Sequence, residues 1–400
     1  MGAGGEYPLA ARVQSSAAPV VIDMPAAKWH GCMAGRVTMR KAMIFVLVLG
    51  WALPAAAGAE SGAADDAGTA DKLKAALADP ECLAEVDVPD TAYAEYIGAR
   101  LIKCTGEGGK LDQPVAMEIG GRAYTYYGDR LSLKGTDADG VVTLGVLGAI
   151  KDYSDETRAA LDFFLDRFAA EKIDALVLDG DLAATEYEIT QVVLHCAERG
   201  WLTLVLIGNT EGRTAFNRAL LNAYKVAPNA INFDFVRRVD LGGATLVSLP
   251  GYLDRKFVHQ SGGCSYKPRE IDALTDYTAA TEQPVVLVSH GPPAGEDKRA
   301  LDTAVEAGNV GDARLAGFLR EHQIAFGLFG HILEAGGRAV DRQGEPVAAG
   351  EWVKNAYLNV GSANPLPWQL NSGELSCGMG ALMQIKGDQA RFEFIEHPCK

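Results

Sequence analysis

The sequence predicts an α/β sandwich with mixed sheets, preceded by a small N-terminal module. From about residue 141, runs of aliphatic and β-branched residues alternate with segments in which apolar residues recur every three or four positions. That alternation is typical of strands and helices that build a parallel sheet. Two strand patterns without an intervening helix end the chain and predict antiparallel strands at the edges. With 48% apolar residues in 400, the chain can bury a full core.

The elements of the main domain, residues 141–400, follow from these patterns in order. Helical spacing of apolar residues predicts helices at 157–172, 190–200 and 213–225. A hairpin-like pair is expected at 236–251, and a terminal antiparallel pair at 380–387 and 390–397. The continuous apolar runs predict buried strands at 141–148, 174–181, 201–209, 283–291, 324–331 and 355–362.

Residues 71–140 predict the small module, which follows a polar linker at 60–70. It opens with helical patterns at 71–77 and 90–104. Two strand patterns, 115–119 and 122–127, are then separated by two glycines, which is a hairpin signal. We expect this module to form an extra layer over one side of the main domain.

Residues 39–59 have the pattern of a secretory signal peptide. A basic start, Met39-Arg40-Lys41, precedes an apolar stretch at 42–53, and small residues lead up to Ala59. The stretch is shorter than the roughly 20 residues that a membrane span requires. We therefore expect cleavage before Glu60, with a second option at 55–57, and an exported protein that is periplasmic or extracellular and keeps no stable membrane span. Because such signals begin at the initiator, we interpret residues 1–38 as an upstream extension of the reading frame.

Six cysteines remain after that cleavage. An even number in an exported protein suggests disulfides. We expect Cys82–Cys104, since both lie in the N-terminal module, and also Cys377–Cys399. Cys196 lies in a helical pattern and is expected to be a buried free thiol. No Cys-x-x-Cys spacing occurs, so a cysteine zinc site is not expected.

Four polar side chains follow predicted strands directly. Asp181, Asn209, His290 and His331 each stand at the carboxyl end of a buried apolar run. The carboxyl ends of parallel strands are where open α/β sheets bind ligands. Carboxylate, amide oxygen and imidazole together suit a divalent transition metal such as Mn, Fe or Zn. The sequence therefore predicts that these four side chains form a metal site.

Residues 141–364 resemble the calcineurin-like metallophosphoesterases. That family has five short blocks: Asp-x-His, Gly-Asp, Gly-Asn-His-Asp/Glu, a lone His, and Gly-His-x-His. The corresponding segments here, in the same order, are 149–151, 180–181, 208–211, His290 and 330–333. Residues 359–362 resemble the strand and turn that closes the family domain. The resemblance implies a two-sheet sandwich with two metal ions that bracket a phosphate, activate water and stabilise the leaving oxygen.

The resemblance also implies that one of the two metal sites is incomplete. Asp181 would bridge the ions, and Asn209, His290 and His331 would complete the second site. The ligands that belong only to the first site are replaced by Ala149, Lys151 and Leu333, and the histidine beside the metal-binding asparagine is replaced by Thr210. We interpret Lys151 as a fixed positive charge near Asp181 in place of the first ion. A slip of Asp152 into the empty ligand position would reverse its face on the strand.

We expect a phosphate-type ligand at a reduced, one-metal site. Lys151, Thr210 and Arg213 are the candidate phosphate contacts. Hydrolysis of phosphoesters would be weak or unusual; the alternative is an inactive pseudo-enzyme that binds a ligand or a protein. Phosphate-containing small molecules and phosphoproteins are the expected partners. Nucleic acid is not an expected partner, because the chain has a formal charge of −15 and no run of basic residues offsets it. A serine hydrolase is poorly supported because no Gly-x-Ser-x-Gly elbow occurs.

Overall fold

The computed structural model describes residues 83–84, 86–106, 109–135, 140–279 and 281–399. The expected extension, signal peptide and linker lie outside the described residues, as do the helix expected at 71–77 and Cys82. The boundaries expected for these segments stay predictions.

One of two large sheets has six strands in the order β19-β18-β4-β5-β6-β7. Strands β4, β5, β6 and β7 run parallel, while β18 pairs antiparallel with both β19 and β4. The strands are β4 (Val141–Leu147), β5 (Ala175–Asp179), β6 (Leu202–Leu206), β7 (Ala230–Asn232), β18 (Met379–Lys386) and β19 (Gln389–Glu396).

The other large sheet has nine strands in the order β1-β2-β3-β8-β9-β10-β13-β15-β14. Its middle strands β9, β10, β13 and β15 are parallel, and β14 pairs antiparallel at the edge. The strands are β1 (Val115–Ile119), β2 (Arg122–Tyr126), β3 (Arg130–Leu133), β8 (Arg238–Asp240), β9 (Thr245–Leu249), β10 (Val285–Ser289), β13 (Phe326–Phe329), β14 (Arg338–Val340) and β15 (Ala356–Asn359). Two short hairpins, β11 (Thr303–Ala304) with β12 (Gly308–Asn309) and β16 (Trp368–Gln369) with β17 (Leu375–Ser376), lie outside both sheets.

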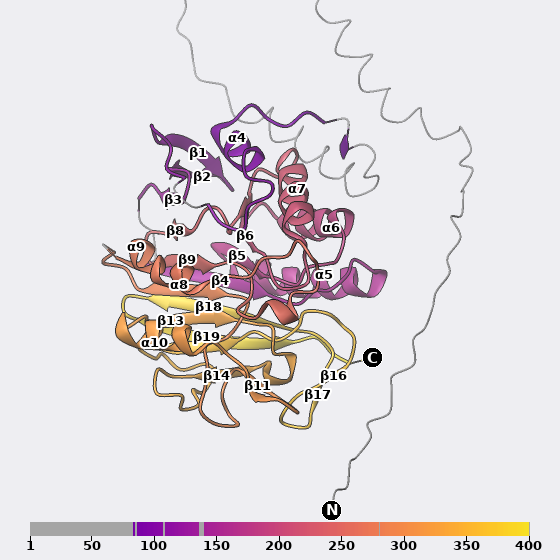
Figure 1. The fold of residues 1–400 in the computed structure, drawn as a ribbon, viewed down its shortest axis with the longest axis vertical. Helices are drawn as coiled ribbons and strands as arrows, with labels where there is room; N and C mark the ends of the chain where they lie inside the picture. Colours follow the sequence, from indigo (N-terminus) through magenta and orange to yellow (C-terminus); the bar gives the residue numbers. More distant parts are fainter. Residues whose placement is uncertain (1–82, 85, 107–108, 136–139, 280, 400) are drawn as a thin grey trace, which may run out of the picture. The chain divides into compact units, whose positions relative to one another are not determined.

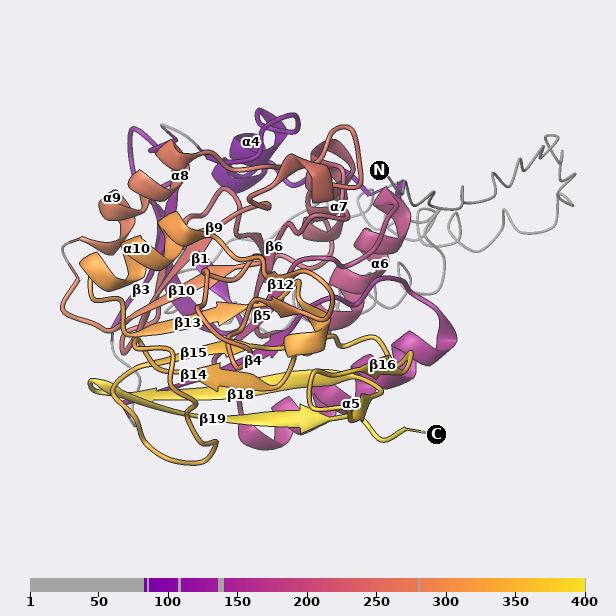
Figure 2. The ribbon, with the colours of Figure 1, turned by 60° about the horizontal axis from the view of Figure 1, so that its bottom comes forward.

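The two sheets pack face to face and helices cover their outer faces (Figures 1 and 2). The core between the sheets includes Val146 and Val177 from one sheet and Leu246 and Val288 from the other. Alternate strand residues such as Leu178 turn outward onto the helices, because successive side chains of a strand face opposite sides. The two-sheet α/β sandwich with mixed sheets expected from the sequence is therefore confirmed.

The helices divide between the two outer faces according to their apolar sides. The longest helix of the described residues is α5, whose N-cap Ser154 accepts a hydrogen bond from the backbone of Thr157 and whose end at Lys172 is left-handed. The six-stranded sheet carries α5 (Asp155–Glu171), α6 (Glu186–Ala197) and α7 (Arg213–Tyr224). The nine-stranded sheet carries α8 (Pro268–Asp272), α9 (Leu274–Thr278) and α10 (Ala313–Glu321). The short η1 (Arg255–Phe257) and η2 (Leu333–Ala335) lie in loops.

The segment that precedes β4 does not form a separate layer over the main domain. The hairpin expected around two glycines is present as β1 and β2, but β3 pairs in parallel with β8. The three strands therefore extend the edge of the nine-stranded sheet. The helix expected at 90–104 is shorter, α4 (Ala92–Gly98), and packs against α7. The expectation of an extra layer was wrong because the unpaired edge of β8 accepts a further strand.

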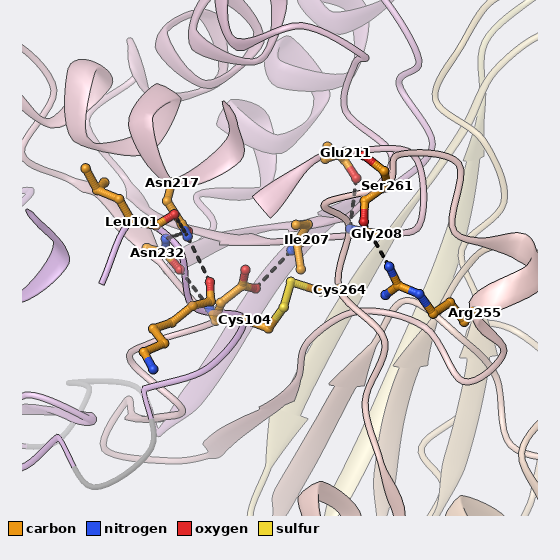
Figure 3. The surroundings of a disulfide bond; sticks show 12 residues. Leu101, Cys104, Ile207, Gly208, Glu211, Asn217, Asn232, Arg255, Ser261 and Cys264 are labelled. Carbon is orange, nitrogen blue, oxygen red and sulfur yellow. Dashed lines mark hydrogen bonds between the residues drawn. A yellow bond between two sulfur atoms is a disulfide. The ribbon is translucent and has the colours of Figure 1, made fainter. Parts of the chain in front are cut away.

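Two disulfides are present in the described part of the chain. Cys377–Cys399 is confirmed, and Cys196 is a buried free thiol as expected. The expected Cys82–Cys104 pair was wrong, because Cys104 is bonded to Cys264, 160 residues further along the chain (Figure 3). The bond joins the segment after α4 to the loop after β9. Within the described residues, no helix has the length and apolar character needed to span a membrane.

Loss of the Cys104–Cys264 bond should destabilise the fold more than loss of Cys377–Cys399. The bonds close loops of 160 and 22 residues, for which loop-closure entropy gives about 5 and about 3 kcal/mol. The paired variants Cys104→Ala/Cys264→Ala and Cys377→Ala/Cys399→Ala should therefore differ in free energy of unfolding, measured with urea. A smaller loss for the longer loop would contradict this ranking.

Candidate metal and anion site

Five side chains from both sheets meet at the carboxyl ends of their strands. The six-stranded sheet contributes Lys151 after β4, Asp181 after β5 and Asn209 after β6. The nine-stranded sheet contributes His290 after β10 and His331 after β13. Each follows a strand with no intervening helix, so the register of the buried apolar run fixes its position.

Asp181 is the central group of this site. It is 1% exposed, and its Oδ1 accepts hydrogen bonds from the backbone of Asn209 at 3.0 Å and of Thr210 at 2.9 Å. The imidazole Nε2 of His290 lies 3.3 Å from the same oxygen. The other oxygen, Oδ2, is bonded to the ammonium of Lys151. Each oxygen of the buried carboxylate therefore has a positively polarised partner.

Asn209 brings the two histidines together. Its Oδ1 lies 2.9 Å from Nε2 of His290 and 3.0 Å from Nδ1 of His331. Its Nδ2 donates to the carbonyl of Phe257 at 2.6 Å, which turns the amide oxygen towards the histidines. Nδ1 of His290 lies 2.8 Å from the carbonyl of Asp179, so Nε2 is the nitrogen that faces the site. Amide oxygen and two ring nitrogens thus converge on one point.

This donor set fits one transition metal ion. The ligand-type atoms of Asp181, His290 and His331 lie within 4.8 Å of one another. The Thr210 hydroxyl oxygen beside them is buried and has no hydrogen-bond partner in the described part of the chain. Such an orphaned group is consistent with a ligand or a water that completes its bonding.

The positions expected to lack ligands for a first ion lie where the sequence placed them. Ala149 is 1% exposed and offers no donor atom, and Leu333 begins η2. The third position is occupied by Lys151, whose ammonium forms an ion pair with Asp181. Two residues from the turn after β15 hold this loop: Ser362 donates to the carbonyl of Ala149 at 2.8 Å, and Asn364 to that of Ile150 at 2.6 Å.

Asp152 does not replace a missing ligand. Its Oδ1 accepts from the backbone of Ser154 and from the hydroxyl of Thr157, and its Oδ2 accepts from Asn364 at 3.0 Å. These bonds commit the carboxylate to the start of α5. A charged residue next to Lys151 therefore belongs to the scaffold of the loop.

The backbone of the site is held in a conformation that L-residues rarely adopt. Ala149, Lys151, Asp181 and His331 have φ of 49°, 74°, 56° and 65°, and they are four of the six described non-glycine residues with left-handed φ. Each such residue costs on the order of 1 kcal/mol. Strain concentrated at strand ends is typical of functional sites, where the surrounding bonds impose it.

Charge separation inside the site follows from burial and proximity. Burial opposes protonation of His290, but the Asp181 carboxylate outweighs it and raises the pKa of the imidazole to about 9. Burial alone would raise the pKa of Asp181, yet His290 and Lys151 lower it well below its usual range. Burial and the charge of His290 lower the pKa of His331 to about 3. The protein without a ligand therefore pairs an ionised Asp181 with two cations and keeps His331 neutral.

Three further residues contribute to the site and were not predicted from the sequence. Tyr252 stacks on His331 with ring centroids 4.0 Å apart. Glu211 is fully buried and accepts a hydrogen bond from the backbone of Gly208 at 3.0 Å (Figure 3). It also accepts one from the backbone of Leu182, so that it ties two of the strand-end loops together. Burial, with a smaller effect of Asp181, raises the pKa of Glu211 to about 7.

Asp179 is the third of these residues. It is 0% exposed, and neither of its carboxylate oxygens has a hydrogen-bond partner in the described part of the chain. Burial raises its pKa to about 8. The sequence did carry a signal for it, because an acidic residue at the end of an apolar run has to be buried or turned aside.

Arg213 begins α7 and is half-buried, and its role as a phosphate contact stays a prediction. Outside the site, a second group of metal-ligand type is formed by Asp162, His195 and Glu198. There Nε2 of His195 lies 2.9 Å from Asp162, and Nδ1 lies 3.1 Å from the Tyr153 hydroxyl. Any measurement of bound metal has to separate the two groups.

Comparison with known proteins gives matches only among solved structures. No model of a protein family matches the chain, and no curated protein matches it. The structure is similar to that of a dimetal phosphatase from Danio rerio (13% identity; 65% of this chain and 99% of that chain; TM-score 0.42). It is also similar to TT1561 of Thermus thermophilus (14%; 64% and 99%; 0.43) and to purple acid phosphatase PPD1 from yellow lupin (9%; 68% and 54%; 0.40).

Replacement of Glu211 should destabilise the fold in a graded way. Glu211→Ala leaves two buried backbone N–H groups without acceptors, which costs about 2–6 kcal/mol. Glu211→Gln keeps one acceptor oxygen and should cost about half as much. Urea unfolding of both variants measures the difference. Equal stability of wild type and Glu211→Ala would show that Glu211 does not hold the two loops together.

Proposed function

We propose that this chain is an exported protein of the metallophosphoesterase class that binds a phosphate-type ligand at a one-metal site. The observation that carries the proposal is the contact of the Lys151 ammonium with one oxygen of Asp181, while the other oxygen faces His290. In the two-metal arrangement that the sequence motifs resemble, two ions would share the bridging carboxylate. Here the Lys151 ammonium supplies a positive charge at that carboxylate.

Asp181, Asn209, His290 and His331 would hold the remaining ion. Mixed carboxylate, amide and imidazole donors suit Mn, Fe or Zn. Such an ion supplies Lewis acidity, which polarises a phosphoryl oxygen and lowers the pKa of water. Tyr252 packs on the ring of His331, and the backbone carbonyl of Asp179 accepts a hydrogen bond from Nδ1 of His290. These two contacts fix the ring orientations of both histidines.

Lys151 would bind a phosphate oxygen and position the ligand. Its side chain is 34% exposed, although its ammonium bonds to a buried carboxylate. An ammonium holds an anionic oxygen by charge and hydrogen bonds. It cannot activate water as a divalent ion does. Thr210 would bond the same ligand, and its buried hydroxyl without a partner among the described residues supports this role. Binding without fast hydrolysis is the behaviour that this combination favours.

The second candidate function is a binding module without turnover. It is favoured by the absence of donor atoms at Ala149 and of an imidazole at Thr210 and Leu333. The ligand would still be a phosphate-containing small molecule or a phosphoprotein. Export is supported by two disulfides, which persist in oxidising compartments.

The full chain purified without chelator should carry about one equivalent of transition metal at this site. Asp181→Ala/His331→Ala should lose it, because two of the donors disappear. Elemental analysis measures the content. A control variant, His195→Ala, removes the second metal-type group and should keep the equivalent. Metal lost in His195→Ala and kept in Asp181→Ala/His331→Ala would place the ion elsewhere and contradict the proposal.

Lys151→Ala should weaken binding of inorganic phosphate by roughly tenfold, since one charge-assisted contact disappears. Lys151→Arg keeps the charge and should lose less. Calorimetric titration of metal-loaded protein measures both affinities, with metal content checked in each variant. Unchanged affinity in Lys151→Ala would exclude the lysine as an anion ligand.

Turnover of a chromogenic phosphate monoester by the same samples separates the two candidate functions. Slow turnover that Asp181→Ala abolishes would indicate an enzyme. Phosphate binding without any turnover above that of Asp181→Ala would indicate a binding module.

A further inference from the structure

A cavity that shares no lining residue with the strand-end site lies next to Tyr252, whose backbone carbonyl accepts a hydrogen bond from the lining residue Tyr266. Its volume is about 540 Å³, and it lies between the segment after α4 and the loop after β9. Ligand sites for small molecules commonly have about 300–1,000 Å³. The cavity is therefore large enough for a molecule the size of a phosphorylated sugar or a nucleotide.

The described residues that line this cavity are strongly basic. They include Arg100, Lys103, Lys267 and Arg269, against a single carboxylate, Glu270. The chain as a whole has a formal charge of −15. The four cations therefore create a local positive potential in this cavity, in contrast to the acidic chain as a whole.

Glu270, the one carboxylate among the lining residues, already accepts hydrogen bonds from its neighbours. Its oxygens accept from the backbone of Lys267 at 2.7 Å and from Nε of Arg269 at 2.9 Å. Arg100 lies with its guanidinium carbon 3.7 Å from the ring centroid of Tyr96 and donates to the Tyr96 carbonyl, which orients it. Lys103 and Lys267 are exposed, and neither makes an ion pair within the described part of the chain. Their charges are available to a ligand.

The walls that carry the two lysines are held together covalently. Lys103 precedes Cys104, and Lys267 lies three residues after Cys264, so the disulfide joins the two segments (Figure 3). Asn217 of α7 donates to the carbonyls of Leu101 and Lys103, both at 3.0 Å, and fixes one wall. Two segments distant in sequence are thus fixed side by side with like charges facing one hollow. Like charges repel unless an anion lies between them.

We propose that this cavity is a binding site for a small anion that carries more than one phosphate group. Several separate cations match several anionic groups better than a single one, and ammonium and guanidinium are the usual phosphate ligands of proteins. The limited volume and the acidic remainder of the chain favour a small molecule over a nucleic-acid backbone.

Calorimetric titration with inorganic pyrophosphate at low salt tests this site. Wild type should bind one more equivalent of pyrophosphate than Lys103→Ala/Lys267→Ala does. If both bind the same number of equivalents, wild type should bind pyrophosphate at least about tenfold more tightly. The affinity should fall as salt rises, because the lysines are solvent-exposed. Lys103→Arg/Lys267→Arg keeps both charges and should retain the binding event.

Two controls make the result specific. Lys354→Ala removes an exposed lysine that pairs with Asp388 elsewhere on the molecule and should leave binding unchanged. Lys151→Ala alters the strand-end site and should leave this event in place, so failure of the proposed function and failure of this inference are distinguishable. Thermal unfolding checks that each variant is folded. Equal pyrophosphate stoichiometry and affinity in wild type and Lys103→Ala/Lys267→Ala, or no binding to wild type, would overturn the proposal.

Discussion

The contact between Lys151 and Asp181 is the interaction on which the organisation of the strand-end site depends. Asp181 is almost fully buried, and a buried carboxylate without a compensating charge is strongly unfavourable. One of its oxygens receives two backbone N–H groups and faces an imidazole, and the other receives an ammonium. The protein therefore compensates the buried carboxylate with positive charges of its own side chains. The rest of the site is built around an already compensated centre.

That compensation also links the two sheets. Asp181 and Asn209 come from the six-stranded sheet, while His290 and His331 come from the other. Their contacts join the carboxyl edges of both sheets. The bonds of Glu211 tie two loops of the six-stranded sheet to each other. The apolar core between the sheets sets how closely these edges approach. Packing thus fixes the positions, and charge decides which side chains are tolerated there.

The sequence predicted the parts of this arrangement that depend on local pattern. Buried apolar runs placed Asp181, Asn209, His290 and His331 at strand ends, and strand ends of one sandwich converge. Sequence patterns did not reveal Cys104–Cys264 or the stacking of Tyr252 on His331, because both join segments that only the tertiary fold brings together. The joining of β3 to β8 was missed for the same reason, since a free sheet edge leaves no mark in the sequence.

The left-handed backbone at Ala149 and Lys151 has a consequence for substitutions at these two positions. Hydrogen bonds from Ser362 and Asn364 to backbone carbonyls hold the path of this loop, and the Lys151 side chain adds its bond to Asp181. The backbone path is thus held largely by groups outside positions 149 and 151. A substitution at position 149 or 151 is therefore expected to change the chemical groups displayed at the site while the loop keeps its path.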